Sequence, residues 1–174
     1  MEDRTKSIWT LGHSTRSIEG FLLILKDFHI EVLADVRTLP GSRRYPHFNQ
    51  EALTETLSAE GIRYLHFPEL GGRRKPSPDS VNTAWRHPSF KGYADYMQTR
   101  EFAGGIERLT GIATLYRTAY MCSEAVWWKC HRGLISDYLK VRGWSVIHIL
   151  EVAKGEEHPY TSPARVVQGE LFYD

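Results

Sequence analysis

The sequence predicts an α/β fold: a single three-layer domain with a mainly parallel sheet of about five strands flanked by helices. Short apolar stretches rich in β-forming residues alternate with segments whose apolar residues recur at helical spacing. A chain of 174 residues suffices for one domain with a sizeable core. The content of 41% hydrophobic and 25% charged residues is ordinary for a globular protein. We therefore expect residues 1–174 to form one domain.

The first half of the chain predicts three strands and two helices. Ser17 is expected to cap a helix whose buried face carries Ile18, Phe21, Leu22, Leu25 and Phe28. Asn49 is expected to cap the second helix, and Gly61 to end it in a left-handed conformation. The predicted strands cover residues 8–11, 31–36 and 62–67.

The second half continues the alternation after a long loop. Residues 68–80, PELGGRRKPSPDS, predict irregular structure because of their prolines, glycines and charges. Gly104 and Gly105 weaken the second of the helices that follow. From about residue 154 we expect an irregular tail with a short strand at 170–173. The other predicted elements are helices over 89–97, 102–113 and 133–142 and strands over 117–122 and 144–150.

Polar side chains collect where the predicted strands end. In open parallel sheets, ligands bind outside the carboxyl ends of the strands. We therefore place the site at this edge of the sheet. The residues at the strand ends are His13, Ser14, Asp35, Arg37, Glu69, Cys122 and Glu124.

The two cysteines, Cys122 and Cys130, are the strongest sign of chemistry. Their separation matches neither a Cys-x-x-Cys redox motif nor a common zinc-finger spacing, and no phosphatase-type Cys-x5-Arg loop is present. Cys130 precedes a predicted helix, where the helix dipole and Arg132 would favour its thiolate. Glu124 and His131 add a carboxylate and a proton carrier. The alternatives are that both cysteines belong to the core, or that they bind a metal with His131 and His13.

Several arginines are candidates for holding an anion. The turn Gly12–Ser17 could present backbone N–H groups together with Arg16. Asp35 and Arg37 share one side of their strand, either as an ion pair alone or as a pair that orients a ligand. The basic loops at 43–44 and 73–75 are either solvated surface or, with the aromatic residues after Arg43 and Arg44, a nucleic-acid contact.

The net charge and the hydropathy of the chain bear on its partners and its cellular location. A formal net charge of +1 gives no bulk electrostatic reason to bind nucleic acid or membrane. No apolar run approaches a membrane span, and the polar start MEDRTKS lacks the apolar core of a signal peptide. We therefore expect a cytoplasmic protein whose cysteines are reduced thiols.

Several motifs in a shared order resemble the family called domain of unknown function 488 (DUF 488). They are TLGHSTRS, ADVRTLPGSRRYPHFN, GIRYLHFPELGGRR, YMCSE, CHRGLISDYL and the strand VIHI. The family pattern has one cysteine in Met-Cys-x-Glu and one in Cys-His-Arg, which here are Cys122 and Cys130, and it implies enzymatic activity. Trp127 and Trp128 between them depart from the pattern and would pack in the core or wall a pocket. A fold-level analogy to rhodanese-type sulfur transferases is weaker, because their active loop is not matched.

The leading hypothesis is a cysteine-dependent transferase or hydrolase acting on an anionic small molecule, a nucleotide or a nucleic acid. Cys130 would be the nucleophile, Cys122 a resolving or supporting thiol, His131 or Glu124 a proton carrier, and Arg16, Arg37 and Arg132 the anion-holding cations. The alternatives are a binding module for nucleic acid or protein that uses the arginine-rich loops, and a metal-binding protein. The sequence identifies neither a cofactor nor the oligomeric state.

Overall fold

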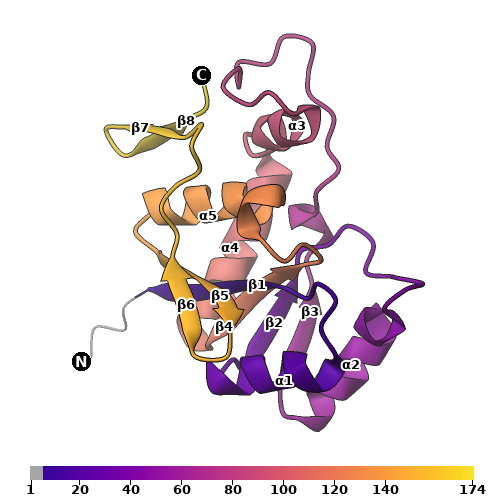
Figure 1. Cartoon of the computed structure of the whole chain (residues 1–174). Coiled ribbons are helices and arrows are strands. Elements are labelled where there is room, and N and C mark those ends of the chain that lie inside the picture. Colours follow the sequence, from indigo (N-terminus) through magenta and orange to yellow (C-terminus); the bar gives the residue numbers. More distant parts are fainter. Residues whose placement is uncertain (1–5) are drawn as a thin grey trace.

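A computed structural model describes residues 6–174 of the chain, with a sheet at its centre (Figure 1). Most of the polar start, residues 1–5, lies outside the described part. Within residues 6–174 the strands are β1 (Ser7–Gly12), β2 (Val32–Asp35), β3 (Arg63–His66), β4 (Thr118–Cys122), β5 (Ser145–Glu151), β6 (Lys154–Glu157), β7 (Arg165–Val167) and β8 (Glu170–Phe172). The α-helices are α1 (Ile18–Asp27), α2 (Gln50–Ala59), α3 (Pro88–Tyr96), α4 (Arg100–Leu115) and α5 (Arg132–Val141). Short 3-10 helices are η1 (Pro46–Phe48), η2 (Pro68–Leu70) and η3 (Trp127–Lys129).

The central sheet has six strands in the order β3-β2-β4-β1-β5-β6. The first five are parallel, and β6 pairs antiparallel with β5. The register places Gly12 of β1 beside Cys122 of β4, and Asp35 of β2 beside Met121. The ends of β1, β2 and β4 therefore meet at one edge, as the sequence predicts.

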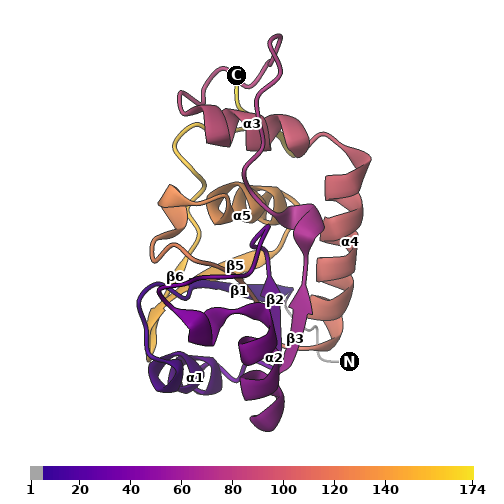
Figure 2. The same ribbon diagram turned by 90° about the vertical axis from the view of Figure 1, so that its right-hand side faces the viewer.

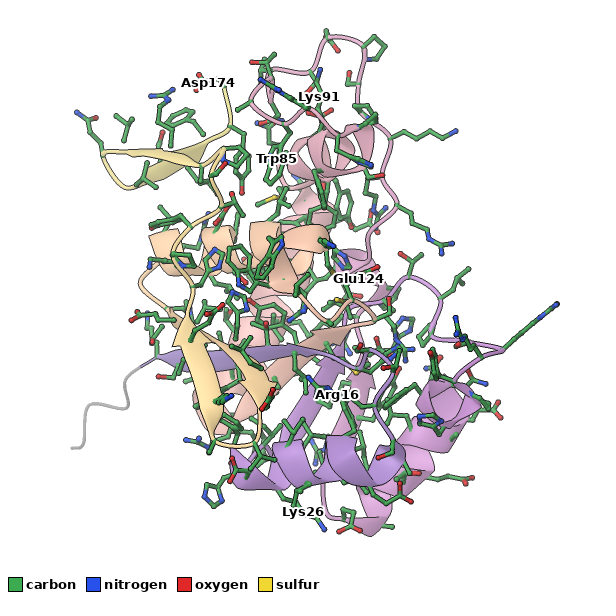
Figure 3. The ribbon with its side chains drawn as sticks, in the orientation of Figure 1. Arg16, Lys26, Trp85, Lys91, Glu124 and Asp174 are labelled. Atoms are coloured by element: carbon green, nitrogen blue, oxygen red, sulfur yellow. The ribbon has the colours of Figure 1, made fainter. Side chains whose placement is uncertain are left out.

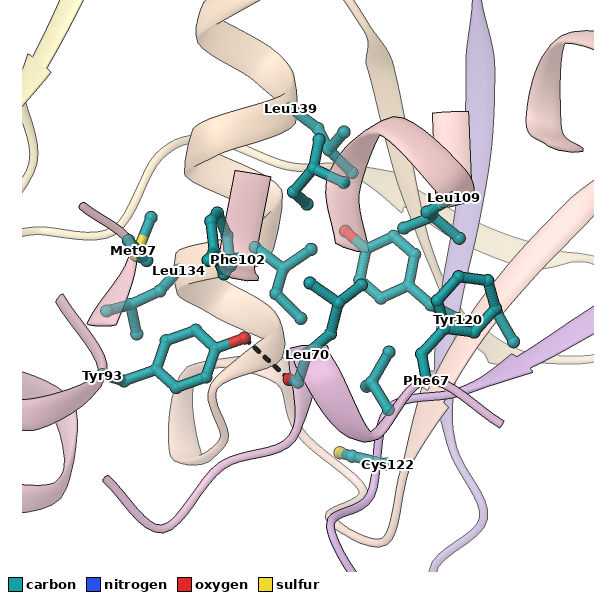
Figure 4. Packing of buried hydrophobic residues seen from close by; sticks show 14 of the residues in the cluster. Phe67, Leu70, Tyr93, Met97, Phe102, Leu109, Tyr120, Cys122, Leu134 and Leu139 are labelled. Atoms are coloured by element: carbon teal, nitrogen blue, oxygen red, sulfur yellow. Dashed lines mark hydrogen bonds between the residues drawn. The ribbon is translucent and has the colours of Figure 1, made fainter. Parts of the chain in front are cut away.

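Helices cover both faces of the sheet (Figure 2). One face packs against α1 and α2 through an apolar cluster that includes Phe21, Leu33 and Leu53. The other face packs against α4 and α5, with α3 lying farther out on the same side. Figure 4 shows this second cluster, in which the Tyr93 hydroxyl donates to the Leu70 carbonyl and Cys122 lies at the margin. The predicted three-layer α/β fold is confirmed.

The predicted elements are all present with ends shifted by a few residues, and two predictions need correction. The segment from residue 154 is not an irregular tail, because β6 extends the sheet and β7 pairs with β8. All four residues of β6 are exposed, so it lacks the apolar alternation that marks a strand in sequence. Asn49 occupies the N-cap of α2 without capping it, since its side-chain oxygen accepts from Ser42 N–H at 2.6 Å. Gly61 follows α2 with φ +75°, as expected.

Among residues 6–174 no helix is both long and apolar enough to cross a membrane.

Candidate functional site

A cleft of about 970 Å³ opens at the carboxyl edge of the sheet. Its walls come from the ends of β1 and β4, the segments after β2 and β3, helix α3 and the segment that leads into α5. The sequence-predicted residues that line it are His13, Ser14, Arg37, Cys122, Glu124, Cys130 and His131.

Gly12 allows the ends of β1 and β4 to meet closely. A Cβ atom at this position would lie 1.6 Å from the carbonyl oxygen of Glu124, so any side chain would push the two segments apart. The backbones beyond are joined by hydrogen bonds from His13 N–H to Cys122 O and from Ser14 N–H to Ser123 O, both 3.0 Å. This contact fixes His13 and the Cys122 segment against each other.

Cys122 and Cys130 are free thiols whose sulfur atoms lie 2.7 Å apart. Burial raises the pKa of Cys130, but the hydrogen bond from Cys122 and the charge of Arg132 outweigh burial and hold that pKa below its ordinary value. Burial and the neighbouring Cys130 raise the pKa of Cys122 well above its ordinary value. Cys130 therefore ionises first, and the Cys122 thiol is then the donor, because a thiolate only accepts.

Arg132 lies behind the two sulfur atoms and is 1% exposed. Its Nε donates to Cys122 Sγ at 3.0 Å, and its backbone N–H lies 3.5 Å from Cys130 Sγ. One Nη2 bond to the Glu124 carbonyl, at 2.8 Å, ties the same guanidinium to the loop after β4. A buried guanidinium in this place offsets the cost of a buried thiolate.

His131 is oriented as a proton acceptor for Cys130. Its Nε2 lies 2.8 Å from the carbonyl of Val36, which can only accept, so Nε2 carries the proton. Burial lowers the pKa of His131, which keeps the ring neutral and leaves Nδ1 unprotonated. That atom lies 3.4 Å from Cys130 Sγ. Cys130 and His131 thus form a thiol and base pair.

Asp35 and Arg37 form a buried ion pair at the side of the cleft. Arg37 Nε and Nη2 bind the two carboxylate oxygens of Asp35 at 2.9 and 2.7 Å. Nη2 also donates to the Phe48 carbonyl, and Nη1 lies 3.4 Å from His13 Nε2. Burial lowers the pKa of His13 to about 4, so this nitrogen accepts. Because most of its N–H groups already have protein partners, Arg37 is mainly a structural cation.

Four of the predicted arginines, Arg16, Arg43, Arg44 and Arg132, do not line the cleft. Arg16 donates to the carbonyls of Gly12 and Leu150, and Figure 3 shows it nearer α1, whereas Glu124 lies nearer the start of α5. Arg43 and Arg44 are exposed on the loop after β2. Asp35 and Arg132 lie behind the cleft wall and support residues that line it.

The cleft also contains Gly72, Tyr93 and Lys129, which the sequence did not single out, together with Arg73 of a predicted basic loop and Trp128 of the tryptophan pair. Gly72 lies against the ring of His131, where a Cβ atom would be 3.0 Å from Nδ1. The Tyr93 ring of α3 also packs against the His131 ring, with ring centroids 5.1 Å apart. The rim carries Arg73, Lys129 and the half-exposed Trp128. The tryptophan pair is divided, since Trp127 is buried in the core and Trp128 walls the cleft. The loop pattern of GGRR hinted at Gly72 and Arg73, but no local signal marks Tyr93.

Among the residues that the structure describes, no group of three or more His, Cys, Asp and Glu side chains is arranged to hold a metal ion.

Comparison with known families identifies the chain. The family model "Domain of unknown function DUF488" matches residues 17–139, and the chain belongs to this family. No curated protein and no solved structure matches it. The matched segment contains both cysteines, His131 and Arg132, whereas Thr10, His148 and His158 lie outside it.

Proposed function

We propose that this DUF488 protein is a cysteine-dependent transferase or hydrolase that uses the Cys130 thiolate on an anionic substrate. The observation that carries the proposal is the placement of two thiols against a buried guanidinium at the base of a cleft. A buried cation beside a thiolate and a base beside a thiol are the two ways in which proteins activate cysteine. Here both act on Cys130.

The residues divide the chemical work as follows. His131 Nδ1 accepts the proton of the Cys130 thiol, and the thiolate attacks an electrophilic carbon or phosphorus atom. The leaving group departs with the proton from His131 as the bond to sulfur forms. Water or a second substrate then gives a proton to the neutral His131 and displaces the sulfur, which leaves as the thiolate. Cys122 donates its hydrogen bond to Cys130 throughout.

The charge of the cleft favours an anionic substrate. Arg73 and Lys129 lie at its rim, and Glu124 opposes them in part. Trp128 and Tyr45 offer aromatic surfaces on which a nucleotide base could stack. We also place this activity in the cytoplasm, where glutathione and thioredoxin keep thiols reduced.

The test is the pH dependence of iodoacetamide labelling, read at each cysteine by mass spectrometry on the folded protein. We expect Cys130 to react below pH 7, whereas an unperturbed thiol titrates near pH 8.5. Cys122→Ala removes the hydrogen-bond donor and should raise the midpoint for Cys130. Slow labelling of both cysteines at all pH values would contradict the proposal.

A second arm tests the substrate class. Inorganic phosphate and a nucleoside monophosphate should each slow the labelling of Cys130, and the uncharged nucleoside should not. Equal protection by the nucleoside would show that the cleft recognises the aromatic base and not the negative charge. Labelling of the unfolded protein at the same pH provides the reference rate.

A further inference from the structure

A chain of buried hydrogen bonds runs from the thiol pair to Asp137 in the middle of α5. Arg132 Nη1 donates to Thr10 Oγ1 at 2.8 Å, and Thr10 Oγ1 lies 2.7 Å from His148 Nδ1. His148 Nε2 lies 2.8 Å from His158 Nδ1, and His158 Nε2 lies 2.7 Å from Asp137 Oδ1. The side chains of these five residues are at most 1% exposed. Their contacts are therefore made with the protein and hardly at all with bulk water.

One set of bond directions gives every donor in this chain an acceptor. The guanidinium of Arg132 only donates, so Thr10 accepts from it, and the Thr10 hydroxyl can donate its own proton to His148 Nδ1. His148 is neutral, because burial lowers its pKa to about 2, and its proton is therefore on Nε2. His158 Nδ1 must accept that proton, which leaves the proton on Nε2 to be donated to Asp137. Each donor meets an acceptor.

Other contacts hold the chain in place. The ring of Trp127 stacks on His148, with centroids 4.8 Å apart and planes 7° from parallel. Tyr173 donates to the second oxygen of Asp137 at 2.7 Å, and Thr161 donates to both oxygens through its N–H and hydroxyl. Asp137 is thus a fixed buried acceptor at one end, and Arg132 is a fixed buried donor at the other.

We infer that Thr10, His148, His158 and Asp137 are positioning residues that hold the Arg132 guanidinium against Cys122 and so sustain the Cys130 thiolate. The inference rests on the proposed function and deepens it. None of the four touches the cleft. They act through Arg132: the Thr10 bond to Nη1 joins the Nη2 bond to the Glu124 carbonyl in holding Nε at Cys122 Sγ. The long side chain of an unsupported arginine has much rotational freedom to lose, and the chain removes that freedom in advance.

The test compares two substitutions of Thr10. Thr10→Val keeps the shape and removes the hydroxyl, so Arg132 Nη1 and His148 Nδ1 both lose their partner. Thr10→Ser keeps the hydroxyl. We expect Thr10→Val to raise the pH midpoint of Cys130 labelling by about one unit, and Thr10→Ser to restore most of the shift. The other titratable groups near the thiols are His131, Tyr93 and Tyr120, and all remain unchanged in these variants.

Thr118→Val is the matched control. Thr118 is a buried threonine at the other end of β4, and its hydroxyl donates to the Tyr116 carbonyl at 3.0 Å. The substitution removes one buried hydrogen bond without touching the chain, so the labelling midpoint should stay unchanged even if stability falls. If the wild-type labelling midpoint of Cys130 lies below pH 7 and Thr10→Val does not change it, this inference is overturned and the proposed function is not. A wild-type protein without labelling below pH 7 would overturn the proposed function as well.

A second measurement needs no variant. Side-chain ¹⁵N shifts of the histidines in the whole protein report which ring nitrogen carries the proton. At pH 7 the ring proton of His148 should be on Nε2, where it is donated to His158 Nδ1. A proton on Nδ1 of His148 would break the direction of the chain and overturn the inference.

Discussion

At the scale of single residues, the reactivity proposed for Cys130 rests on three neighbouring residues. Arg132 supplies positive charge, Cys122 a hydrogen bond and His131 a base. The sequence already predicted Arg132 as the cation, Cys122 as the supporting thiol and His131 as a proton carrier. It could not place the ring, because the ring is set by the Val36 carbonyl, 95 positions earlier in the chain.

Gly72→Ala tests the position of His131. The added Cβ atom would lie 3.0 Å from Nδ1 of an imidazole that also packs against the Tyr93 ring, so the imidazole must shift by a few tenths of an ångström. We expect the pH midpoint of Cys130 labelling to rise by about half a unit, or ~0.7 kcal/mol. Gly111→Ala, which meets nothing within 4 Å, is the control. Equal profiles for both variants would show that His131 does not assist Cys130.

At the scale of elements, α4 shows why adjacent glycines need separate explanations. The sequence predicted a weakened helix there, yet α4 runs unbroken through Gly104 and Gly105. A Cβ atom on Gly105 would lie 2.6 Å from Glu69 Cγ and 2.8 Å from Leu70 Cδ2, so this glycine lets α4 pack against η2. A Cβ atom on Gly104 would meet nothing within 4 Å. Only the tertiary contact distinguishes them.

The two substitutions to alanine should therefore have opposite effects on stability. Gly104→Ala should raise the free energy of unfolding by about 0.5–1 kcal/mol, because alanine loses less conformational entropy in a helix. Gly105→Ala should lower it by about 1–3 kcal/mol through overpacking against Leu70. Urea unfolding followed by circular dichroism measures both. A gain in stability from both variants would contradict the packing argument.

The elements also show which parts of the fold can be predicted from the sequence. Apolar periodicity located the strands and helices of the core, because burial on one or both faces leaves a pattern. The strand β6 leaves none, since its residues are exposed and its pairing with β5 alone makes it a strand. The cysteine motif predicted the site, whereas the residues behind Arg132 are widely separated. Asp137, His148 and His158 are ordinary residues in sequence and meet only after folding.

At the scale of the whole molecule, buried neutral histidines make the fold sensitive to acid. Burial lowers the pKa of His13 to about 4 and that of His148 to about 2, below the value near 6.5 of the unfolded chain. At a pH between the folded and the unfolded pKa of each histidine, the unfolded chain binds a proton that the folded protein does not. Stability is therefore fully present above pH 6.5 and falls as the pH falls toward 4 and below.

We expect the free energy of unfolding in urea to fall by at least about 2 kcal/mol between pH 7 and pH 4.5. His13→Gln removes one titrating group and should make the dependence shallower. Asp79 and Asp95, whose hydrogen bonds lower their pKa below the ordinary value, contribute the same sign only at still lower pH. A stability that is constant from pH 7 to pH 4.5 would show that these histidines take up protons in the folded protein as readily as in the unfolded chain.

The buried chain behind Arg132 bears on the order in which the protein becomes functional during synthesis. Thr10 leaves the ribosome first, and both cysteines follow it. His148, His158 and Tyr173 leave after the cysteines. A nascent chain that has reached only the end of α5 already has both thiols and Arg132, but it lacks the histidines that join Thr10 to Asp137. On the proposed mechanism, Arg132 therefore gains its full support for the Cys130 thiolate only after β5 and the segment that follows β6 have folded.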